Sequence, residues 1–536
     1  MARRHLSELR RSISRILVVG SGPAGVACAT ALLDQGAQVT MLDAGLELEP
    51  SRRSQLADLQ SVAFTSWDEP SLRFLREGVG VSGGGIPLKL AYGSDFPYRD
   101  PIDQPITATG VHAKSSFARG GLSNVWGASV LPYRTDDMRG WPITADDLAP
   151  HYRAALKMMP FSGRHDGLEQ HFPLYHDQPG TLASSNQAAS LLHDLELSEP
   201  AVTARGMRFG AARLALQSDV TDGRPACVYC GKCVYGCPYE FIYNSSQSVE
   251  RLRTNHAFTY RSGIVVERLQ EIASRVKVTG RTLDDNAAFE IQADKAFLAG
   301  GVFSTARIML ASLEAFEFPI HAVDNCYFLL PLLRYQSQAA VSEEPLYTLA
   351  QVFIELFDPG MQTVHLQVYT YNELFMRSLG PLRLLLPGPA RRSLLGRLLL
   401  IQGYLHSDLS ARIEITLRRG IGNNPPTLAL ARDENPRTRP ALKALRRRLW
   451  GERNSMKAFP FSPAMRVGEP GRGFHTGGTF PMRLTPHALE VDVLGRASEF
   501  TNVHLVDASV FPSLPATTIT LSVMANAHRI GAAALA

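Results

Sequence analysis

Four of the six cysteines in this chain fall within eleven residues. Cys227, Cys230, Cys233 and Cys237 have the spacing C-x2-C-x2-C-x3-C, and Pro238 follows directly. Thiolates two residues apart can reach different irons of one iron–sulfur cluster, whereas structural zinc sites usually take two separated ligand pairs. The spacing therefore favours an iron–sulfur cluster over a zinc site or four free thiols.

The cysteine count leaves the type of cluster open. The run has the spacing found in bacterial ferredoxins, where the fourth cysteine of such a run serves a second cluster. Only one run occurs here, so three arrangements are possible. Cys237 completes a four-iron cluster, Cys326 supplies the fourth ligand, or three thiolates hold a three-iron cluster. Cys28 falls in a predicted helix and is expected to be buried. Such clustering in a long chain indicates a reducing compartment rather than a disulfide framework.

A glycine-rich turn follows the first apolar stretch of the chain. Residues 16–19 form a β-branched run, and Gly20, Gly22 and Gly25 then form G-x-G-x-x-G at the start of an alanine-rich stretch that includes Ala24. These glycines permit a tight turn, a close approach to a pyrophosphate, and packing of helix on strand. Asp43 ends the next predicted strand, where a carboxylate accepts a ribose hydroxyl. This unit predicts dinucleotide binding but does not separate NAD from FAD.

Further segments resemble the glucose–methanol–choline (GMC) family of oxidoreductases. Residues 119–127 (RGGLSNVWG) are similar to the family's glycine loop along the flavin, and residues 299–306 (AGGVFSTA) to its second flavin-domain turn. Residues 506–512 (VDASVFP) resemble its C-terminal acidic strand, and residues 141–148 its linking segment. These segments occur in the family's order and span nearly the whole chain.

The resemblance implies FAD as the cofactor and an alcohol as the substrate, with hydride passing to flavin N5 and the hydroxyl proton to a base. It also implies an α/β fold, in which a discontinuous Rossmann-like FAD-binding lobe is joined to an α+β substrate lobe with an antiparallel sheet. The residues expected to bind the cofactor are Gly20, Gly22, Ala24, Gly25, Asp43, Arg119, Gly121, Asn124, Val265, Gly300, Asp507 and Thr520.

The segment 473–479 (GFHTGGT) resembles the family's histidine motif and implies that His475 lies over the flavin ring. An imidazole with a pKa of about 6.5 accepts a proton at neutral pH, so we predict that His475 is the general base. The family's usual partner is a second histidine or an asparagine, but Thr518 stands where asparagine is expected. A hydroxyl can donate a hydrogen bond to a substrate oxygen but does not share proton transfer as histidine does.

Some membrane-linked sugar dehydrogenases related to this family carry a cluster in a similar place. The resemblance therefore implies that the cysteine run passes electrons singly to an external acceptor, either a quinone or a redox protein. The predicted function is an FAD-dependent dehydrogenase of a sugar-like, sterol-like or lipid-linked alcohol. The alternatives are an oxidase with a structural metal in the cysteine loop, and a catalytically degenerate flavoprotein subunit, which the departure at Thr518 permits.

The composition is that of an ordinary globular protein, with 45% hydrophobic and 20% charged residues and a formal charge of +5. This small charge does not indicate nucleic-acid binding. Residues 51–98 lack periodicity and predict loops, 265–280 predict a β-hairpin, and 503–536 predict a strand, a turn and a helix. The predicted domain segments are 15–160, 251–320 and 466–536 for the FAD-binding lobe, 161–221 for a connecting or substrate-lobe segment, 222–250 for the cysteine-rich segment and 321–465 for the substrate lobe.

The stretch between Glu373 and Asp408 contains no acidic residue and is rich in leucine and arginine. Apolar faces flanked by arginine suit a helix that lies on an anionic membrane; the alternative is a helix packed on its own sheet. No run of about 18 apolar residues occurs, so we expect no spanning helix. Residues 1–14 lack the apolar core of a cleaved signal. We expect a cytoplasmic protein, either free or peripheral at the inner face of the membrane. The basic run from Lys443 to Arg453 predicts a solvated helix face.

Overall fold

The glycine-rich turn joins the first strand and first helix of a parallel sheet in the computed structural model, which describes residues 15–77, 86, 88–100, 104–220, 223, 225–357, 362–378, 386–422 and 424–535. Strand β1 (Arg15–Val19) leads through this turn into α2 (Pro23–Asp34) and then β2 (Gln38–Leu42). The sheet has the order β20-β9-β1-β2-β5, with every neighbouring pair parallel. The other strands are β5 (Phe258–Arg261), β9 (Lys295–Leu298) and β20 (Val503–Leu505).

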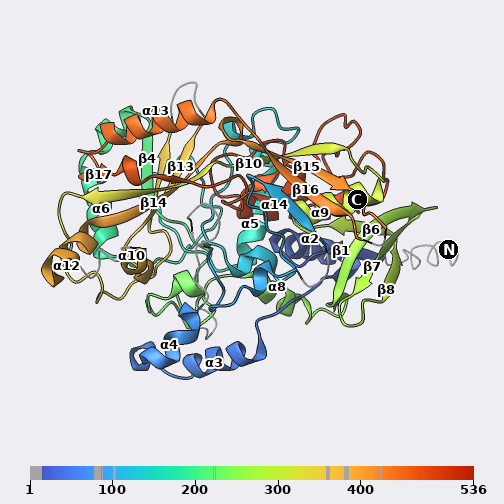
Figure 1. The fold of residues 1–536 in the computed structure, drawn as a ribbon, viewed down its shortest axis with the longest axis horizontal. Helices are drawn as coiled ribbons and strands as arrows, with labels where there is room; N and C mark the ends of the chain where they lie inside the picture. The colour runs from blue at the N-terminus through green and yellow to red at the C-terminus, as the bar shows by residue number, and fades with distance from the viewer. Residues whose placement is uncertain are drawn as a thin grey trace, which may run out of the picture.

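Helices from distant parts of the chain cover this sheet. The last helix, α14 (Thr520–Ala533), packs against both α2 and α5 (Ala145–Lys157). Helix α9 (Val302–Ser312) packs against a separate antiparallel sheet made of β6 (Ile264–Ile272), β7 (Arg275–Thr282) and β8 (Ala288–Ala293). The hairpin predicted at 265–280 is therefore two strands of a three-stranded sheet, which Figure 1 places at the end of the molecule opposite α12 and β17.

The second lobe is built on an antiparallel sheet with the order β17-β11-β14-β13-β12-β4. Strand β18 (Arg466–Val467) also pairs with β11. The sheet is buried on one face by helix α6 (Asn186–Leu197) and helix α13 (Thr438–Gly451), through an apolar cluster that includes Leu191, Leu445 and Leu449. Its strands are β4 (Met207–Ala211), β11 (Tyr327–Arg334), β12 (Val352–Leu356), β13 (Val364–Tyr369), β14 (Leu398–Leu405) and β17 (Ala458–Pro460).

A fourth sheet bridges the lobes with the order β19-β10-β15-β16-β3. Its strands are β3 (Ile106–Thr109), β10 (Pro319–Asp324), β15 (Arg412–Arg418), β16 (Thr427–Asp433) and β19 (Thr476–Gly477). The predicted fold class is confirmed, because a Rossmann-like parallel lobe assembled from separated segments is joined to an α+β lobe with an antiparallel sheet.

The loop predicted for residues 51–98 is wrong in its first half. Helix α3 (Pro50–Gln60) and helix α4 (Glu69–Arg76) occupy it. Helix α3 buries only Leu56 and Leu59 and is otherwise polar, so its sequence carries little periodicity. The remaining helices are α7 (Glu199–Ala204), α8 (Ser245–Leu252), α10 (Glu373–Ser378) and α12 (Gly388–Arg397).

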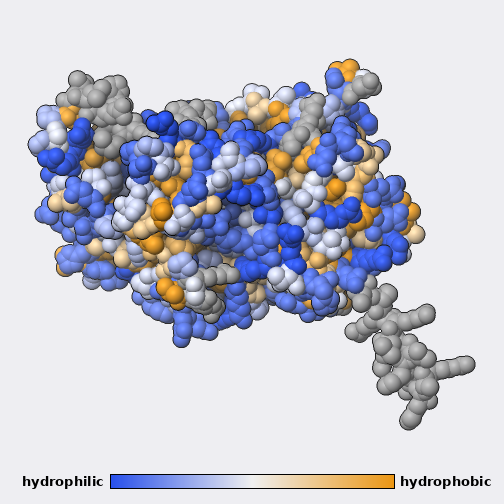
Figure 2. Space-filling model, turned by 90° about the horizontal axis from the view of Figure 1, so that it is seen from below, coloured by the Kyte–Doolittle hydropathy of each residue, from blue (hydrophilic) through white to orange (hydrophobic). Residues whose placement is uncertain are grey.

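The predicted membrane segment is only partly described, because residues 379–385 lie outside the described ranges. Of its remainder, α12 is a short surface helix and the following residues form β14, at the centre of the antiparallel sheet. None of the helices in the described part of the chain is long and apolar enough to span a membrane. Figure 2 shows the face that carries α3 and α4, where hydrophobic residues are scattered among hydrophilic ones.

Two glycines of the first turn make a matched test of its packing. A Cβ at Gly25 would lie 2.0 Å from the backbone oxygen of Gly20, whereas a Cβ at Gly22 would meet nothing within 4 Å. We expect Gly25→Ala to lower the free energy of unfolding by at least ~2 kcal/mol, because overpacking against backbone forces the turn to shift. The free energy of unfolding of Gly22→Ala should lie within ~1 kcal/mol of the wild-type value. Equal thermal stability of the two variants would contradict this account.

Candidate active site

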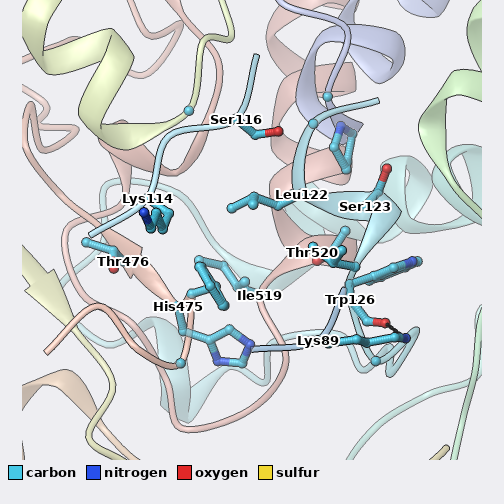
Figure 3. Close-up of a pocket in the computed structure, with 18 of the residues that line it drawn as sticks. Lys89, Lys114, Ser116, Leu122, Ser123, Trp126, His475, Thr476, Ile519 and Thr520 are labelled. Carbon is cyan, nitrogen blue, oxygen red and sulfur yellow. Dashed lines mark hydrogen bonds between the residues drawn. The ribbon is translucent and has the colours of Figure 1, made fainter. Parts of the chain in front are cut away.

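A cavity of about 460 Å³ lies where the parallel lobe meets the antiparallel sheet. This volume falls within the roughly 300–1,000 Å³ of small-molecule sites. Its wall includes the β1–α2 turn, the loop at 114–129, the start of α14 and the loop at 471–476, and Figure 3 shows side chains from these segments around one space. It brings together ten predicted site residues: Gly20, Gly22, Ala24, Asp43, Gly121, Gly300, His475, Asp507, Thr518 and Thr520.

Four residues predicted to bind the cofactor are not part of the cavity wall. Gly25 packs inside the turn, and Val265 lies on β6, where its backbone oxygen approaches Gly280. Arg119 pairs with Glu250 and with Glu47 across its loop. The amide of Asn124 is used within its own loop, where Nδ2 donates to the backbone oxygens of residues 119 and 121.

The end of the cavity near β2 has the features of a dinucleotide site. Gly22 is the N-cap of α2 and leaves open space where a side chain would stand, and the first turn of α2 contains no acidic residue. Backbone N–H groups at a helix N-terminus bind phosphate, so this end of α2 suits a pyrophosphate. The residues present therefore fit FAD in the expected orientation.

Asp43 is buried at the same end of the cavity. Its Oδ2 accepts hydrogen bonds from Ser21 Oγ and from Tyr260 Oη (2.9 Å). Burial raises the pKa of Asp43 to about 6, and the two hydroxyl donors act in the opposite direction. The carboxylate is thus held in place by the protein before any ribose hydroxyl reaches it.

Asp507 also faces the cavity, but its oxygens are already used. Oδ2 accepts from the backbone N–H of Gly301 (2.8 Å) and from Thr305 Oγ1 (2.6 Å), and Oδ1 accepts from the backbone N–H of Ser509 (2.9 Å). Burial raises the pKa of this carboxyl. Asp507 therefore ties the start of α9 to the C-terminal segment at the cavity wall.

His475 is half-buried at the opposite end of the cavity and lies flat against Tyr404. The two ring centroids are 4.3 Å apart with an interplanar angle of 16°. Its Nδ1 is buried and finds no hydrogen-bond partner within the described part of the chain. Burial lowers the pKa of His475 to about 3, with a smaller contribution from the nearby His365. The imidazole is therefore neutral, which is the form that accepts a proton.

The loop that carries His475 is held by a buried carboxylate, Asp324. Its Oδ2 accepts from the backbone N–H of Gly471 (2.9 Å), and its Oδ1 accepts from Thr476 Oγ1 (2.7 Å). Asp324 and Thr476 are also paired in register between β10 and β19. Burial raises the pKa of Asp324 to about 7, although both hydrogen bonds favour its charged form. Asp324 is thus a positioning residue for His475.

Thr518 lies on the cavity wall, as predicted, but its oxygen has a structural partner. Oγ1 accepts a hydrogen bond from the backbone N–H of Leu131 (2.8 Å), which ties the start of α14 to the loop at 128–131. The hydroxyl proton stays available for donation. Thr518 can therefore orient a substrate oxygen.

The floor of the cavity is the uncovered face of the antiparallel sheet and is polar. Gln402 Nε2 donates to Tyr404 Oη (2.6 Å), and Tyr369 Oη donates to Gln367 Oε1 (3.3 Å). These side chains come from the adjacent strands β13 and β14, where residues 367 and 402 are paired in register. A substrate resting on this floor meets amide and phenol groups, which suits a molecule with several hydroxyls or other polar groups.

A buried acid–imidazole pair supports this floor from the side. Glu355 and His365 are fully buried and hydrogen-bonded through Glu355 Oε1 and His365 Nδ1. With Gln367 Nε2 donating to His365 Nε2 (3.1 Å), the ring proton sits on Nδ1 and is donated to Glu355. Burial raises the pKa of Glu355, and His365 acts in the opposite direction. The pair therefore fixes the orientation of the Gln367 amide.

The cysteine run lies immediately beside the cavity. Val234 and Tyr235, within the run, line it, and so does Thr348, whose backbone N–H donates to Cys233 Sγ (3.4 Å). Lys89 donates to the backbone oxygen of Trp126 (2.8 Å) at the cavity wall (Figure 3). Burial lowers the pKa of Lys89 to about 8, and the neighbouring Cys233 and Cys237 act in the opposite direction.

The structure alone does not support the predicted iron–sulfur cluster. Among the described residues, no three His, Cys, Asp or Glu side chains converge into a group that could hold a metal ion. Burial raises the pKa values of Cys227 and Cys237 to about 12, so both are protonated thiols as they stand. The four thiols nonetheless lie close enough to affect one another electrostatically. Their donor type fits a cluster, but their arrangement here is not that of a ligand set.

The two remaining cysteines lie elsewhere. Cys326 packs with the core on the far side of the antiparallel sheet and receives its backbone hydrogen bond from Leu405. Its backbone N–H donates to Ser410 Oγ (2.7 Å), and its charged neighbours are Asp324 and Arg432. Cys28 is fully buried on α2, as expected.

Several residues of the site were not predicted from the sequence. Lys89, Gln367, Tyr369, Gln402 and Tyr404 reach the cavity from strands and loops without a motif, and Asp324 acts from behind the wall. The sequence signal was the alternation of polar and apolar residues along β13 (VHLQVY), which assigns one face of that strand but not its neighbour. Strand β14 (LLLIQGYL) begins with four apolar residues and lacks this signal.

Comparisons with known proteins agree with this fold. No family model and no curated protein matches the chain. Among solved structures, the chain is similar to pyridoxine 4-oxidase from Mesorbium loti, with a TM-score of 0.57 and 16% sequence identity. The match covers 97% of this chain and 98% of that one. At this identity the likeness establishes the shared two-lobe fold over nearly the full length.

Asp324 gives the site a predicted pH dependence. Its folded-state pKa is raised above its unfolded value, so its contribution to stability is fully present below about pH 4 and is lost as the pH rises through about 7. Asp324→Asn removes this titration. We expect the free energy of unfolding of the variant to rise relative to that of the wild type between pH 4 and pH 8, by up to ~1.4 kcal/mol per unit of pKa difference, because only the wild type loses stability over this range. A pH-independent difference in denaturant titrations would contradict the assignment.

Proposed function

We propose that this protein is an FAD-dependent oxidoreductase of the GMC type that oxidises an alcohol group. The observation that carries the proposal is the position of His475. A neutral imidazole with a buried, unpartnered Nδ1 shares one cavity with the glycine turn of a dinucleotide-type parallel sheet. The structural neighbour is by name an oxidase of pyridoxine, which supports an oxidation on this fold.

The chain's own residues have distinct roles in this reaction. Bound FAD would supply the hydride acceptor. His475 accepts the proton of the substrate hydroxyl, and Thr518 donates a hydrogen bond that orients the substrate oxygen. Asp324 holds the histidine loop, and stacking on Tyr404 holds the plane of the imidazole.

The substrate side of the cavity favours a small polar alcohol. Two glutamines and two tyrosines on the sheet present hydrogen-bonding groups, and aromatic rings supply the apolar contacts. A sugar-like or hydroxymethyl-bearing substrate matches this floor, and a lipid-linked sugar would place its polar part here.

The role assigned to His475 can be tested by single-turnover kinetics. With a panel of sugar, hydroxymethyl and sterol alcohols, we expect His475→Ala to slow anaerobic flavin reduction by ~10²–10⁴-fold. Bound flavin should be retained, because the dinucleotide end of the cavity is unchanged. His487→Ala, at an exposed histidine, is the matched control and should reduce flavin at the wild-type rate. An unchanged rate in His475→Ala would contradict its role as the base, and no flavin reduction by the wild type with any of these alcohols would favour a degenerate subunit.

We further propose that the cysteine run takes up an iron–sulfur cluster and that the protein is a dehydrogenase with an external acceptor, a quinone or a redox protein. Support comes from the sequence spacing, from the closeness of the four thiols, and from the position of the run beside the cavity. A cluster supplies one-electron transfer. An oxidase that uses oxygen, with a structural metal in the cysteine loop, is the second candidate, and the name of the structural neighbour favours it.

Metal analysis separates these candidates. Protein purified without oxygen is expected to contain iron and acid-labile sulfide and to give an EPR signal as isolated or after reduction. Cys233→Ser should lose iron while keeping flavin absorption, and Cys326→Ser, at a cysteine away from the run, should keep both. Zinc without iron, together with oxygen consumption during turnover, would overturn the relay and favour the oxidase.

A further inference from the structure

Exposed aromatic side chains gather at the outer end of the antiparallel sheet. Trp450 is 50% exposed, Phe459 45% and Phe461 55%. The rings of Trp450 and Phe459 are 6.1 Å apart, and the ring of Tyr335 lies 4.8 Å from Phe459. We call these four residues the aromatic patch. It lies where α13 ends and β17 forms the sheet edge, at the end of the molecule opposite β6–β8 (Figure 1).

The part of the chain that carries most of the aromatic patch is rich in basic residues. From residue 437 to residue 468 the chain has a single acidic residue, Glu452, which is buried and pairs with Arg205 (2.5 Å). The guanidinium of Arg453 lies over the ring of Trp450 at 5.1 Å. The basic residues of this stretch are Arg437, Arg439, Lys443, Arg446, Arg447, Arg448, Arg453, Lys457 and Arg466. The basic run is therefore more than a solvated helix face, because it borders exposed aromatic rings.

A strip of half-buried apolar side chains joins the aromatic patch to the cavity. Residues paired in register on neighbouring antiparallel strands share one face of the sheet. On this face Phe459 is paired with Leu333, and Leu333 in turn with Leu398. The next rows along β11 and β14 hold Pro331 with Leu400, and then Leu329 with Gln402 of the cavity floor. These leucines and the proline are only partly covered.

We propose that this end of the antiparallel lobe docks on an anionic lipid bilayer. Aromatic side chains settle at the interface of a membrane, and each nearby lysine or arginine adds attraction to anionic headgroups. The face that carries α3 and α4 has its hydrophobic residues scattered among hydrophilic ones, in contrast to the patch (Figure 2). The exposed aromatic rings distinguish a bilayer from an acidic protein partner, because aromatic side chains beside basic residues settle at a membrane interface. The apolar strip in addition offers a lipid-soluble molecule a path to the cavity. That path rests on the proposed function, but the docking does not.

Vesicle sedimentation of the full chain tests the docking without turnover. We expect binding to vesicles of phosphatidylcholine with phosphatidylglycerol, much weaker binding to phosphatidylcholine alone, and a loss of binding at high salt. Arg446→Glu/Arg447→Glu should lower the partition coefficient at least ~10-fold. Trp450→Ser/Phe459→Ser/Phe461→Ser should lower it while leaving the dependence on anionic lipid. His475→Ala should bind like the wild type, which separates docking from catalysis.

Matched controls keep the test decisive. Arg268→Glu/Arg275→Glu reverses two exposed charges at the opposite end, and Phe318→Ser removes a ring that is 53% exposed. Both should bind vesicles like the wild type, and all variants should melt near its temperature. Failure of the wild type to bind anionic vesicles, or equal binding by the patch and control variants, would overturn the proposal. Equal, patch-dependent binding to a soluble polyanion such as heparin would also overturn it.

Discussion

The close approach of two backbone turns is the constraint on which the site depends. A Cβ at Gly20 would lie 2.5 Å from the backbone oxygen of Ala299, so the β1–α2 turn and the turn after β9 touch through main-chain atoms. This contact is possible because β1 and β9 are adjacent and parallel, with Val19 beside Leu298. Both turns then open at the same edge of the sheet, where parallel strands place their ligand sites. The C-terminal segment joins them through Asp507, which binds the N–H of Gly301.

The second half of the site answers a different physical problem, which is to keep an imidazole uncharged and oriented inside the protein. Burial keeps the imidazole of His475 uncharged. Stacking on Tyr404, together with the hydrogen bonds from the loop to Asp324, fixes its orientation. Asp324 is itself a buried carboxylate, which is costly unless it is hydrogen-bonded. Its two bonds from the loop therefore both satisfy the carboxylate and fix the loop. The cavity thus lies between the glycine-rich turns of the parallel lobe and the polar face of the antiparallel sheet.

Much of the parallel lobe could be predicted from the sequence, because its constraints are local. Gly20, Gly22 and Asp43 belong to a short strand–turn–helix–strand unit whose pattern predicts dinucleotide binding. The structure places all three at the cavity. Val265 is not part of the cavity wall, and its contact with the cofactor stays a prediction; it lies on β6 directly after Ile264, whose backbone N–H donates to the backbone oxygen of Asp43 (3.0 Å). Helix α3 was not predicted, because it buries only Leu56 and Leu59 and its sequence therefore shows little periodicity. The polar floor depends on which strands are neighbours in the sheet. The order of strands from distant segments cannot be predicted from the sequence of any single strand.

The order of segments in the parallel lobe also bears on how the protein is made. Strand β20 and helix α14 are the last elements of the described chain, yet β20 is an edge of the parallel sheet and α14 packs against both α2 and α5. The N-terminal parts of a chain leave the ribosome first. The apolar faces of α2 and α5 that contact α14 therefore stay uncovered until α14 has been synthesised. The antiparallel sheet, encoded almost wholly between β1 and β20, has time to form in the interval. The part of the cavity wall that α14 supplies is therefore completed late, after every other segment that lines the cavity has been synthesised.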